Sequence, residues 1–107
     1  MGKIYKGQDA LRIKMTIIGN DNLPIDLTDA QATKIKYKKP TNSGGDIFGS
    51  FNANVESSTG GIIYYDIQSS AEINQIGKWR FWPWITFSDG RSAPGDTVEV
   101  TVYGEGE

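Results

Sequence analysis

One segment of the chain carries most of the information about its fold: Gly77-Lys78-Trp79-Arg80-Phe81-Trp82-Pro83-Trp84-Ile85-Thr86-Phe87, closed by the turn Ser88-Asp89-Gly90. Successive side chains of a β-strand point to opposite faces of a sheet. One face of this strand therefore carries Trp79, Phe81, Ile85 and Phe87, and the other carries Arg80, Trp82, Trp84 and Thr86. The first set is apolar throughout, as a buried core requires, while the second exposes two indoles on the opposite face.

Other segments alternate in the same way and are separated by short turns rich in Gly, Asn, Asp and Pro. Strands are expected over residues 4–6, 10–18, 32–39, 47–55, 62–67, 77–87 and 97–103, with a single helical turn over 71–75. About seven strands at such spacing predict an all-β chain, an antiparallel two-sheet immunoglobulin-like β-sandwich. The predicted core consists of Ile13, Met15, Ile35, Tyr37, Ile63, Tyr65, Trp79, Phe81, Ile85, Phe87, Val98 and Val100.

The length and composition limit the classes of protein to which the chain can belong. Its 107 residues fit a single domain over residues 1–107, with a flexible tail at 104–107. The sequence contains no cysteine and no histidine, which removes disulfides, thiolate nucleophiles and the usual zinc ligands. We therefore expect no enzymatic activity, no cofactor and no metal. The aspartates Asp21, Asp26 and Asp29 do not match a calcium-binding loop and are better explained as turn formers.

The charge and hydropathy patterns exclude two classes of partner. The net charge is −2, whereas nucleic-acid-binding domains usually carry a clear basic excess. No apolar run approaches the roughly 20 residues that a membrane-spanning helix needs. We therefore expect neither a nucleic acid nor a membrane as a partner.

Trp82 and Trp84, with Arg80 beside them, are the candidate binding residues. Contiguous exposed aromatic area usually marks an interface, and tryptophan is enriched among interface hot spots. A subunit interface is the favoured interpretation, and a platform that stacks on sugar rings is the second. In the third, a local loop covers one indole, or Pro83 marks a bulge that turns the side chains. Lys34, Lys36 and Lys38 form a basic strip, either a solvated edge or a contact for an anion.

Several phrases of the sequence occur together in a distinctive order. They are Leu23-Pro24-Ile25-Asp26-Leu27-Thr28-Asp29-Ala30, then Ala32 to Pro40, then Gly77 to Phe87 followed by Ser88-Asp89-Gly90-Arg91, and finally Pro94-Gly95 before Val98-Glu99-Val100. In this order the chain resembles the N-terminal domain of the upper baseplate protein of siphophages and its relatives in tail-fibre gene clusters. The resemblance extends from about Ile4 to Tyr103.

The resemblance implies a structural protein of a tailed-phage virion. The expected role is a small adaptor or anchoring module of the tail, baseplate or fibre. Its partners would be other virion proteins and further copies of the same chain, and its location would be the virion after synthesis in the host bacterial cytoplasm. The alternatives are a carbohydrate-binding module for host attachment, with a host glycan as partner, and a capsid decoration or head-fibre protein.

Overall fold

The fold is all-β, with nine strands in the described part of the chain and no helix there. The computed structural model describes residues 4–8, 11–19, 22–40, 45, 47–69, 71–104 and 106. Because these residues form no helix, none of them supplies a helix that could cross a membrane. The strands are β1 (Ile4–Tyr5), β2 (Arg12–Thr16), β3 (Ala30–Lys39), β4 (Ile47–Asn52), β5 (Asn54–Ser57), β6 (Ile62–Asp66), β7 (Gly77–Phe87), β8 (Ser92–Pro94) and β9 (Val98–Tyr103).

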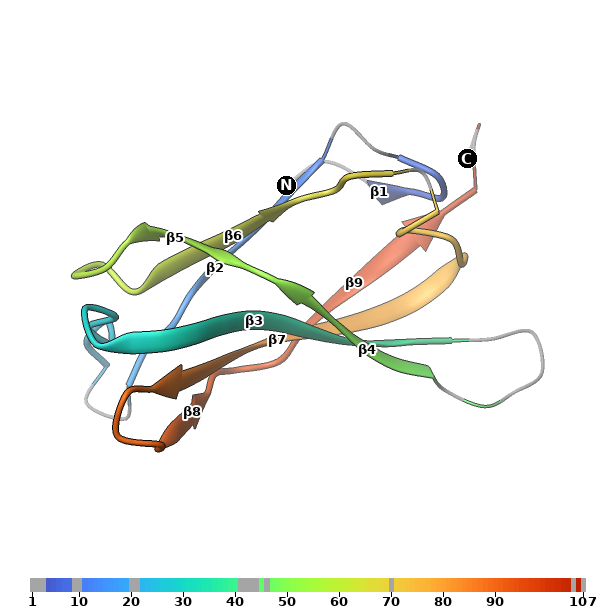
Figure 1. The fold of residues 1–107 in the computed structure, drawn as a ribbon. Coiled ribbons are helices and arrows are strands. Elements are labelled where there is room, and N and C mark those ends of the chain that lie inside the picture. The colour runs from blue at the N-terminus through green and yellow to red at the C-terminus, as the bar shows by residue number, and fades with distance from the viewer. Residues whose placement is uncertain are drawn as a thin grey trace.

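The strands form two sheets that face each other (Figure 1). The larger sheet, which we call sheet A, has the order β1-β9-β7-β3-β4, with β8 paired to the end of β7. The smaller, sheet B, has the order β2-β6-β5. All pairs are antiparallel except that of β1 with β9, which is parallel. The chain is therefore a two-sheet β-sandwich, as the alternating segments predict.

The core lies between the sheets, and β7 supplies its centre. Trp79, Phe81 and Ile85 are buried on the inner face of β7. Ile35 is buried beside them on β3 of the same sheet, and Ile63 is buried on β6 of sheet B. Four other residues of the predicted core, Tyr37, Tyr65, Phe87 and Val100, are partly buried and pack against this cluster. Ile13 and Met15 of β2 are each 9% exposed and complete it from sheet B.

The predicted core position of Val98 is wrong. Its side chain is 45% exposed. Alternation along β9 correctly places it on the same face as Val100 and Val102, but the two sheets do not close over this end of the strand. Val98 instead lines an open groove between β2 and β9.

A row of aromatic rings connects the two sheets through the core. The ring of Tyr37 lies 5.4 Å from that of Trp79 and 4.9 Å from that of Phe51, measured between centroids. Phe51 in turn stacks on Tyr65 of sheet B at 4.5 Å, with the ring planes 3° apart. Aromatic pairs at such distances contribute beyond their buried area. These contacts hold the edge strand β4 to the centre of the sandwich.

The segment expected to be one strand over residues 47–55 is divided between the two sheets. β4 pairs with β3 in sheet A, whereas β5 pairs with β6 in sheet B. The break falls at Ala53, whose amide donates to the carbonyl of Thr33 at 3.0 Å and whose carbonyl accepts the Thr33 hydroxyl at 2.7 Å. Thr33 therefore satisfies the backbone at the point where the chain leaves one sheet for the other.

Two other local expectations also differ from the structure. Residues 71–75 form no helical turn, although the Glu72 carboxylate accepts hydrogen bonds from the backbone amides of Gln68 and Ser69, as in a helix cap. The short strand β8 was not predicted, since its three residues are too few to show an alternating pattern. Of the predicted tail, Glu105 and Glu107 lie outside the described residues.

The same carboxylate also holds a core tyrosine. The hydroxyl of Tyr65 donates to Glu72 Oε2 at 2.6 Å. That hydrogen bond, together with burial, raises the pKa of Tyr65 to about 12. Burial alone would raise the pKa of Glu72, but the hydrogen bonds from Tyr65, Gln68 and Ser69 outweigh it and leave that pKa lowered. Glu72 thus links Gln68 and Ser69 to Tyr65 of β6.

Replacing Tyr65 with phenylalanine should lower the free energy of unfolding by about 1 kcal/mol at neutral pH. Because the folded-state pKa of the phenol is raised, the bond stabilises fully below the unfolded-state pKa of about 10, and this stabilisation is lost as the pH rises through 12. Urea unfolding of both proteins between pH 7 and 11.5 should show the difference shrinking above pH 10. Tyr64→Phe, whose ring lies on the opposite face of β6, is the control. A difference that does not change with pH would contradict this assignment.

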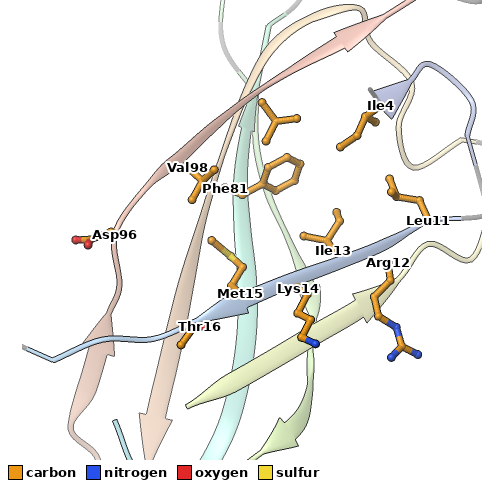
Figure 2. Close-up of a pocket in the computed structure, with 11 residues that line it drawn as sticks. Ile4, Leu11, Arg12, Ile13, Lys14, Met15, Thr16, Phe81, Asp96 and Val98 are labelled. Atoms are coloured by element: carbon orange, nitrogen blue, oxygen red, sulfur yellow. The ribbon is translucent and has the colours of Figure 1, made fainter. Parts of the chain in front are cut away.

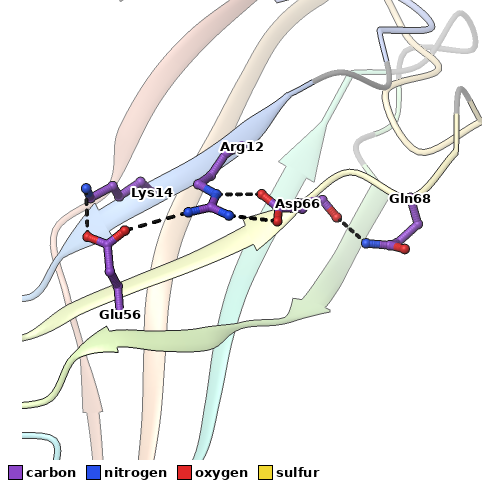
Figure 3. A network of polar contacts seen from close by, with 5 residues as sticks. All are labelled: Arg12, Lys14, Glu56, Asp66 and Gln68. Atoms are coloured by element: carbon purple, nitrogen blue, oxygen red, sulfur yellow. Dashed lines mark hydrogen bonds and ion pairs between the residues drawn. The ribbon is translucent and has the colours of Figure 1, made fainter.

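The outer face of sheet B carries charges that neutralise one another (Figure 3). Arg12 pairs with Asp66 at 2.6 Å and with Glu56 at 3.7 Å, and Lys14 pairs with Glu56 at 2.7 Å. Such exposed pairs contribute little to stability, with a median of about 0–1 kcal/mol. Their effect is on the surface charge, because Arg12 and Lys14 are each neutralised by a nearby carboxylate and this face has no excess of positive charge.

Candidate functional site

The outer face of sheet A brings aromatic and basic side chains together. Because β7 buries its odd-numbered residues from Trp79 to Ile85, the residues between them point away from the core. The antiparallel register sets Lys34 opposite Trp84, Lys36 opposite Trp82, and Lys38 opposite both Arg80 and Phe48. Directly opposed residues share one face of a sheet. We call this surface the Trp–Lys face, defined by Lys34, Lys36, Lys38, Phe48, Arg80, Trp82 and Trp84.

The two indoles are half-buried by neighbours on the same face. The ammonium of Lys36 lies 4.0 Å from the ring centroid of Trp84, within the range of a cation–π interaction. The ring of Phe48 meets that of Trp82 edge to face at 6.5 Å, and Phe48 itself is 68% exposed. The indoles are therefore held in position by Lys36 and Phe48, while a large apolar area around Phe48 stays in contact with water.

Positive charge predominates on this side of the sheet. Lys78 and Arg80 approach Glu99 of β9 only loosely, at 3.8 Å and 3.6 Å. Within the described residues, Lys34 and Lys36 make no ion pair with a carboxylate. Sheet B differs, since each of its outer cations there has an acidic partner. A chain with a net charge of −2 thus has a local basic excess on one face.

A hollow adjoins Trp82 at the side of the face. It has a volume of about 510 Å³ and is lined by Lys38, Arg80, Trp82, Pro94, Gly95, Thr97 and Glu99. An indole and a guanidinium at the rim of a shallow depression can bind a side chain that is both apolar and anionic at its end. Ammonium and guanidinium groups are donors only, so the ligand atoms they bind must be acceptors such as carboxylate oxygens.

Sequence reasoning identified three members of this face, Arg80, Trp82 and Trp84, and separately the basic strip of Lys34, Lys36 and Lys38. The structure places the two sets side by side on neighbouring strands. It adds Phe48, which the sequence prediction did not include and which lies on the opposite face of β4 from the buried Phe51. The signal was present in the sequence, since positions 48 and 51 differ in parity and must face opposite ways.

The acidic residues do not form a site of their own in the described part of the chain. No group of three or more acidic side chains there is arranged to hold a metal ion. The carboxylate of Asp26 accepts both the amide and the hydroxyl of Thr28, and these bonds lower its pKa. The carboxylate of Asp89 accepts the backbone amide of Arg91 and its guanidinium, which lower its pKa in the same way. Both residues act as turn formers, and Asp21 lies outside the described residues.

Comparison with known proteins gives a likeness of fold. No family model and no curated protein sequence matches the chain. Among solved structures, the chain is similar to CopC from Methylosinus trichosporium OB3b, with a TM-score of 0.51 and 14% identity. The alignment covers 100% of this chain and 89% of that protein. At this identity the similarity supports a common β-sandwich architecture.

The predicted role as a structural protein of a tailed-phage virion is contradicted by this comparison. One solved structure that shares the fold over the whole chain is CopC, which is not a phage baseplate protein. The phrases that suggested a phage module are phrases of strands and turns, and residues of the same types form strands and turns in other sandwiches.

Proposed function

We propose that the chain is a non-catalytic binding domain that docks the Trp–Lys face onto an acidic surface of another protein. The observation that carries this proposal is the register that alternates cations with aromatic rings across β3, β4 and β7. Tryptophan and arginine are enriched in interface hot spots, and opposite charge on the partner would speed the encounter and select against wrong partners.

We also propose that the sandwich is of the immunoglobulin-like type. In that fold, one sheet holds the strands C, F and G, extended by C′ in variable-type domains, and the other holds B, E and D. The order β9-β7-β3-β4 in sheet A and β2-β6-β5 in sheet B corresponds to this arrangement. Such domains commonly serve as recognition modules, although the fold alone does not determine a function.

A protein partner is favoured over a sugar or a nucleic-acid base. Both of these ligands would need an open aromatic face on which to stack. Lys36 stands over the ring of Trp84, and the rings of Phe48 and Trp82 meet at 73° with their centroids 6.5 Å apart. The exposed parts of the two indole rings therefore lie next to lysine ammonium groups. This combination suits partner side chains that are partly apolar and partly acidic.

The test uses a synthetic peptide of alternating aspartate and leucine as the probe, with fluorescence anisotropy as the readout. The wild-type chain is expected to bind it, with an affinity that falls as salt rises, because the charges involved are exposed. The double substitution Trp82→Ser and Trp84→Ser should weaken binding at least tenfold, in keeping with hot-spot losses of about 2 kcal/mol or more. Lys34→Glu with Lys36→Glu should weaken it as well.

Tyr64→Ser is the matched control. Tyr64 is an aromatic residue on the outer face of sheet B with a cation over its ring, the Arg12 guanidinium carbon at 4.1 Å from the centroid. This substitution should leave the affinity unchanged. If heparin fragments or single-stranded DNA bind and the acidic peptide does not, the assignment of the partner is wrong. The same holds if the double substitution leaves peptide binding intact in a folded protein.

A further inference from the structure

A second surface, distinct from the Trp–Lys face, lies where the two sheets fail to meet. It is a groove of about 240 Å³ between β2 and β9 (Figure 2). From the β2 side, Leu11, Ile13 and Met15 point toward Phe81 and Val98 on the other sheet, and Val100 completes the lining. The groove is thus an opening into the hydrophobic core, and it explains why Val98 is exposed.

Among the residues that the structure describes, both rims of the groove are strand edges without a neighbour. In the described part of the chain, β2 pairs over residues 12–16 with β6 alone, and β9 pairs over residues 98–101 with β7 alone. Backbone groups on the groove side of each strand therefore have no strand partner. Unpaired edges beside an apolar surface form a template for the addition of another strand.

The rest of the β9 edge already carries such a strand. β1 pairs with β9 in parallel, Ile4 opposite Val102 and Tyr5 opposite Tyr103, and Ile4 is buried at the end of the groove. The groove thus continues an existing strand-to-strand interface. An incoming strand would lie along residues 98–101 of β9, on the side where β1 begins.

Two features determine what kind of occupant fits. A lipid chain or small apolar ligand would cover the groove but leave both strand edges unpaired, whereas an extended peptide satisfies both. Asp96 lies at one end of the groove and makes no ion pair within the described residues. A cation at the corresponding end of the peptide would complement it.

We propose that the groove between β2 and β9 accepts a β-strand from another protein, apolar at alternate positions and carrying a lysine or arginine at the end near Asp96. Alternate side chains would enter the groove beside Phe81 and Val98, and the backbone would pair with the edges of β2 and β9. The sandwich would then hold one more strand than the chain supplies. The Trp–Lys face, on the opposite side of sheet A, takes no part.

The probe is an acetylated, amidated peptide of sequence Lys-Val-Thr-Val-Thr-Val, compared with a peptide of the same composition in which the valines are consecutive. The full chain should bind the alternating peptide at least tenfold more tightly. Hydrogen exchange followed by NMR should show slower exchange of amides in residues 12–16 and 98–101 and no change on the Trp–Lys face. Failure to bind, or binding without protection of these two edges, would overturn the proposal.

Substitutions distinguish binding in the groove from non-specific hydrophobic binding. Val98→Asp should weaken binding of the alternating peptide at least tenfold, and the 45% exposure of Val98 means that the protein should still fold. Leu23→Asp, at a side chain that is 62% exposed and outside the groove lining, should have no effect. Asp96→Lys should reverse the preference, so that a peptide beginning with glutamate binds better than one beginning with lysine.

Analytical sedimentation of the chain without peptide tests whether a second copy of the same chain fills the groove. The protein is expected to remain monomeric, with fast hydrogen exchange of the unpaired amides along the groove edges of β2 and β9. A dimer in which residues 98–101 are already protected would show that a second copy fills the groove, and it would overturn the assignment to another protein.

Discussion

Replacing Trp79 with alanine is expected to lower the free energy of unfolding by about 3–5 kcal/mol, a large part of what a domain of this size possesses. Trp79 is fully buried at the centre of sheet A. Its ring stacks on Phe81 at 5.9 Å and packs against Tyr37 at 5.4 Å, and its indole nitrogen donates to the carbonyl of Gln75 at 2.8 Å. Alanine would leave a cavity and would also remove the hydrogen bond from the indole to that carbonyl.

The matched control is Trp82→Ala, three positions further along the same strand. Trp82 is the same residue type but is half-buried on the outer face. Its loss should cost about 1 kcal/mol, because truncation there leaves no enclosed cavity. Urea unfolding followed by circular dichroism measures both variants without relying on tryptophan fluorescence. Equal losses for the two variants would mean that the faces of β7 are assigned incorrectly.

The inner face of β7 could be predicted because period-two alternation is local information. Trp79, Phe81 and Ile85 needed only their spacing to be placed together. Whether a face is closed by the opposite sheet is not local, and Val98 shows the difference. It continues the alternation of β9 correctly, yet its side chain stays 45% exposed, since β2 is the edge strand of sheet B on that side and leaves a groove there.

Pairing between distant segments was likewise beyond the sequence pattern. The Trp–Lys face exists because β3 lies beside β7, and nothing in either segment specifies that neighbour or its register. The chain passes from one sheet to the other at Ala53, and this depends on Thr33, twenty residues away. The Thr33 hydroxyl donates to the Ala53 carbonyl, and the Thr33 carbonyl accepts the Ala53 amide. Side-chain hydrogen bonds of this kind produce no periodic pattern in the sequence.

The function suggested by resemblance failed for a related reason. The phrase around Asp89, Gly90 and Arg91 has a local physical role, since Gly90 adopts φ +86° and the Asp89 carboxylate receives the amide of Arg91. Any chain that must turn between two paired antiparallel strands benefits from such residues. The phrase therefore reports on the turn, and the binding chemistry must be argued from the surface that the strands assemble.

A glycine that the sequence presents only as part of a hairpin turn is expected to be among the least replaceable residues. Gly61 has φ +64° and is buried. A Cβ atom at this position would lie 2.8 Å from the carbonyl oxygen of Ile17 and 2.9 Å from that of Ile25. Both contacts are with backbone, and the carbonyl of Gly61 itself receives the amide of Ile17 at 2.8 Å. The residue thus joins the end of β2, the segment around Ile25 and the β5–β6 turn.

Gly61→Ala should lower the free energy of unfolding by about 2–5 kcal/mol. Roughly 1–2 kcal/mol comes from the left-handed backbone and about 1–3 kcal/mol from the displacement of packed backbone. Gly90→Ala separates these two costs, because Gly90 also has positive φ but a Cβ there would meet nothing within 4 Å. The Gly90→Ala variant should therefore lose only the part of the unfolding free energy that comes from the left-handed backbone. Thermal and urea unfolding of the two variants gives the comparison. If both lose the same amount, the close approach of Ile17 and Ile25 to Gly61 contributes nothing, and the three segments are not held together at this residue.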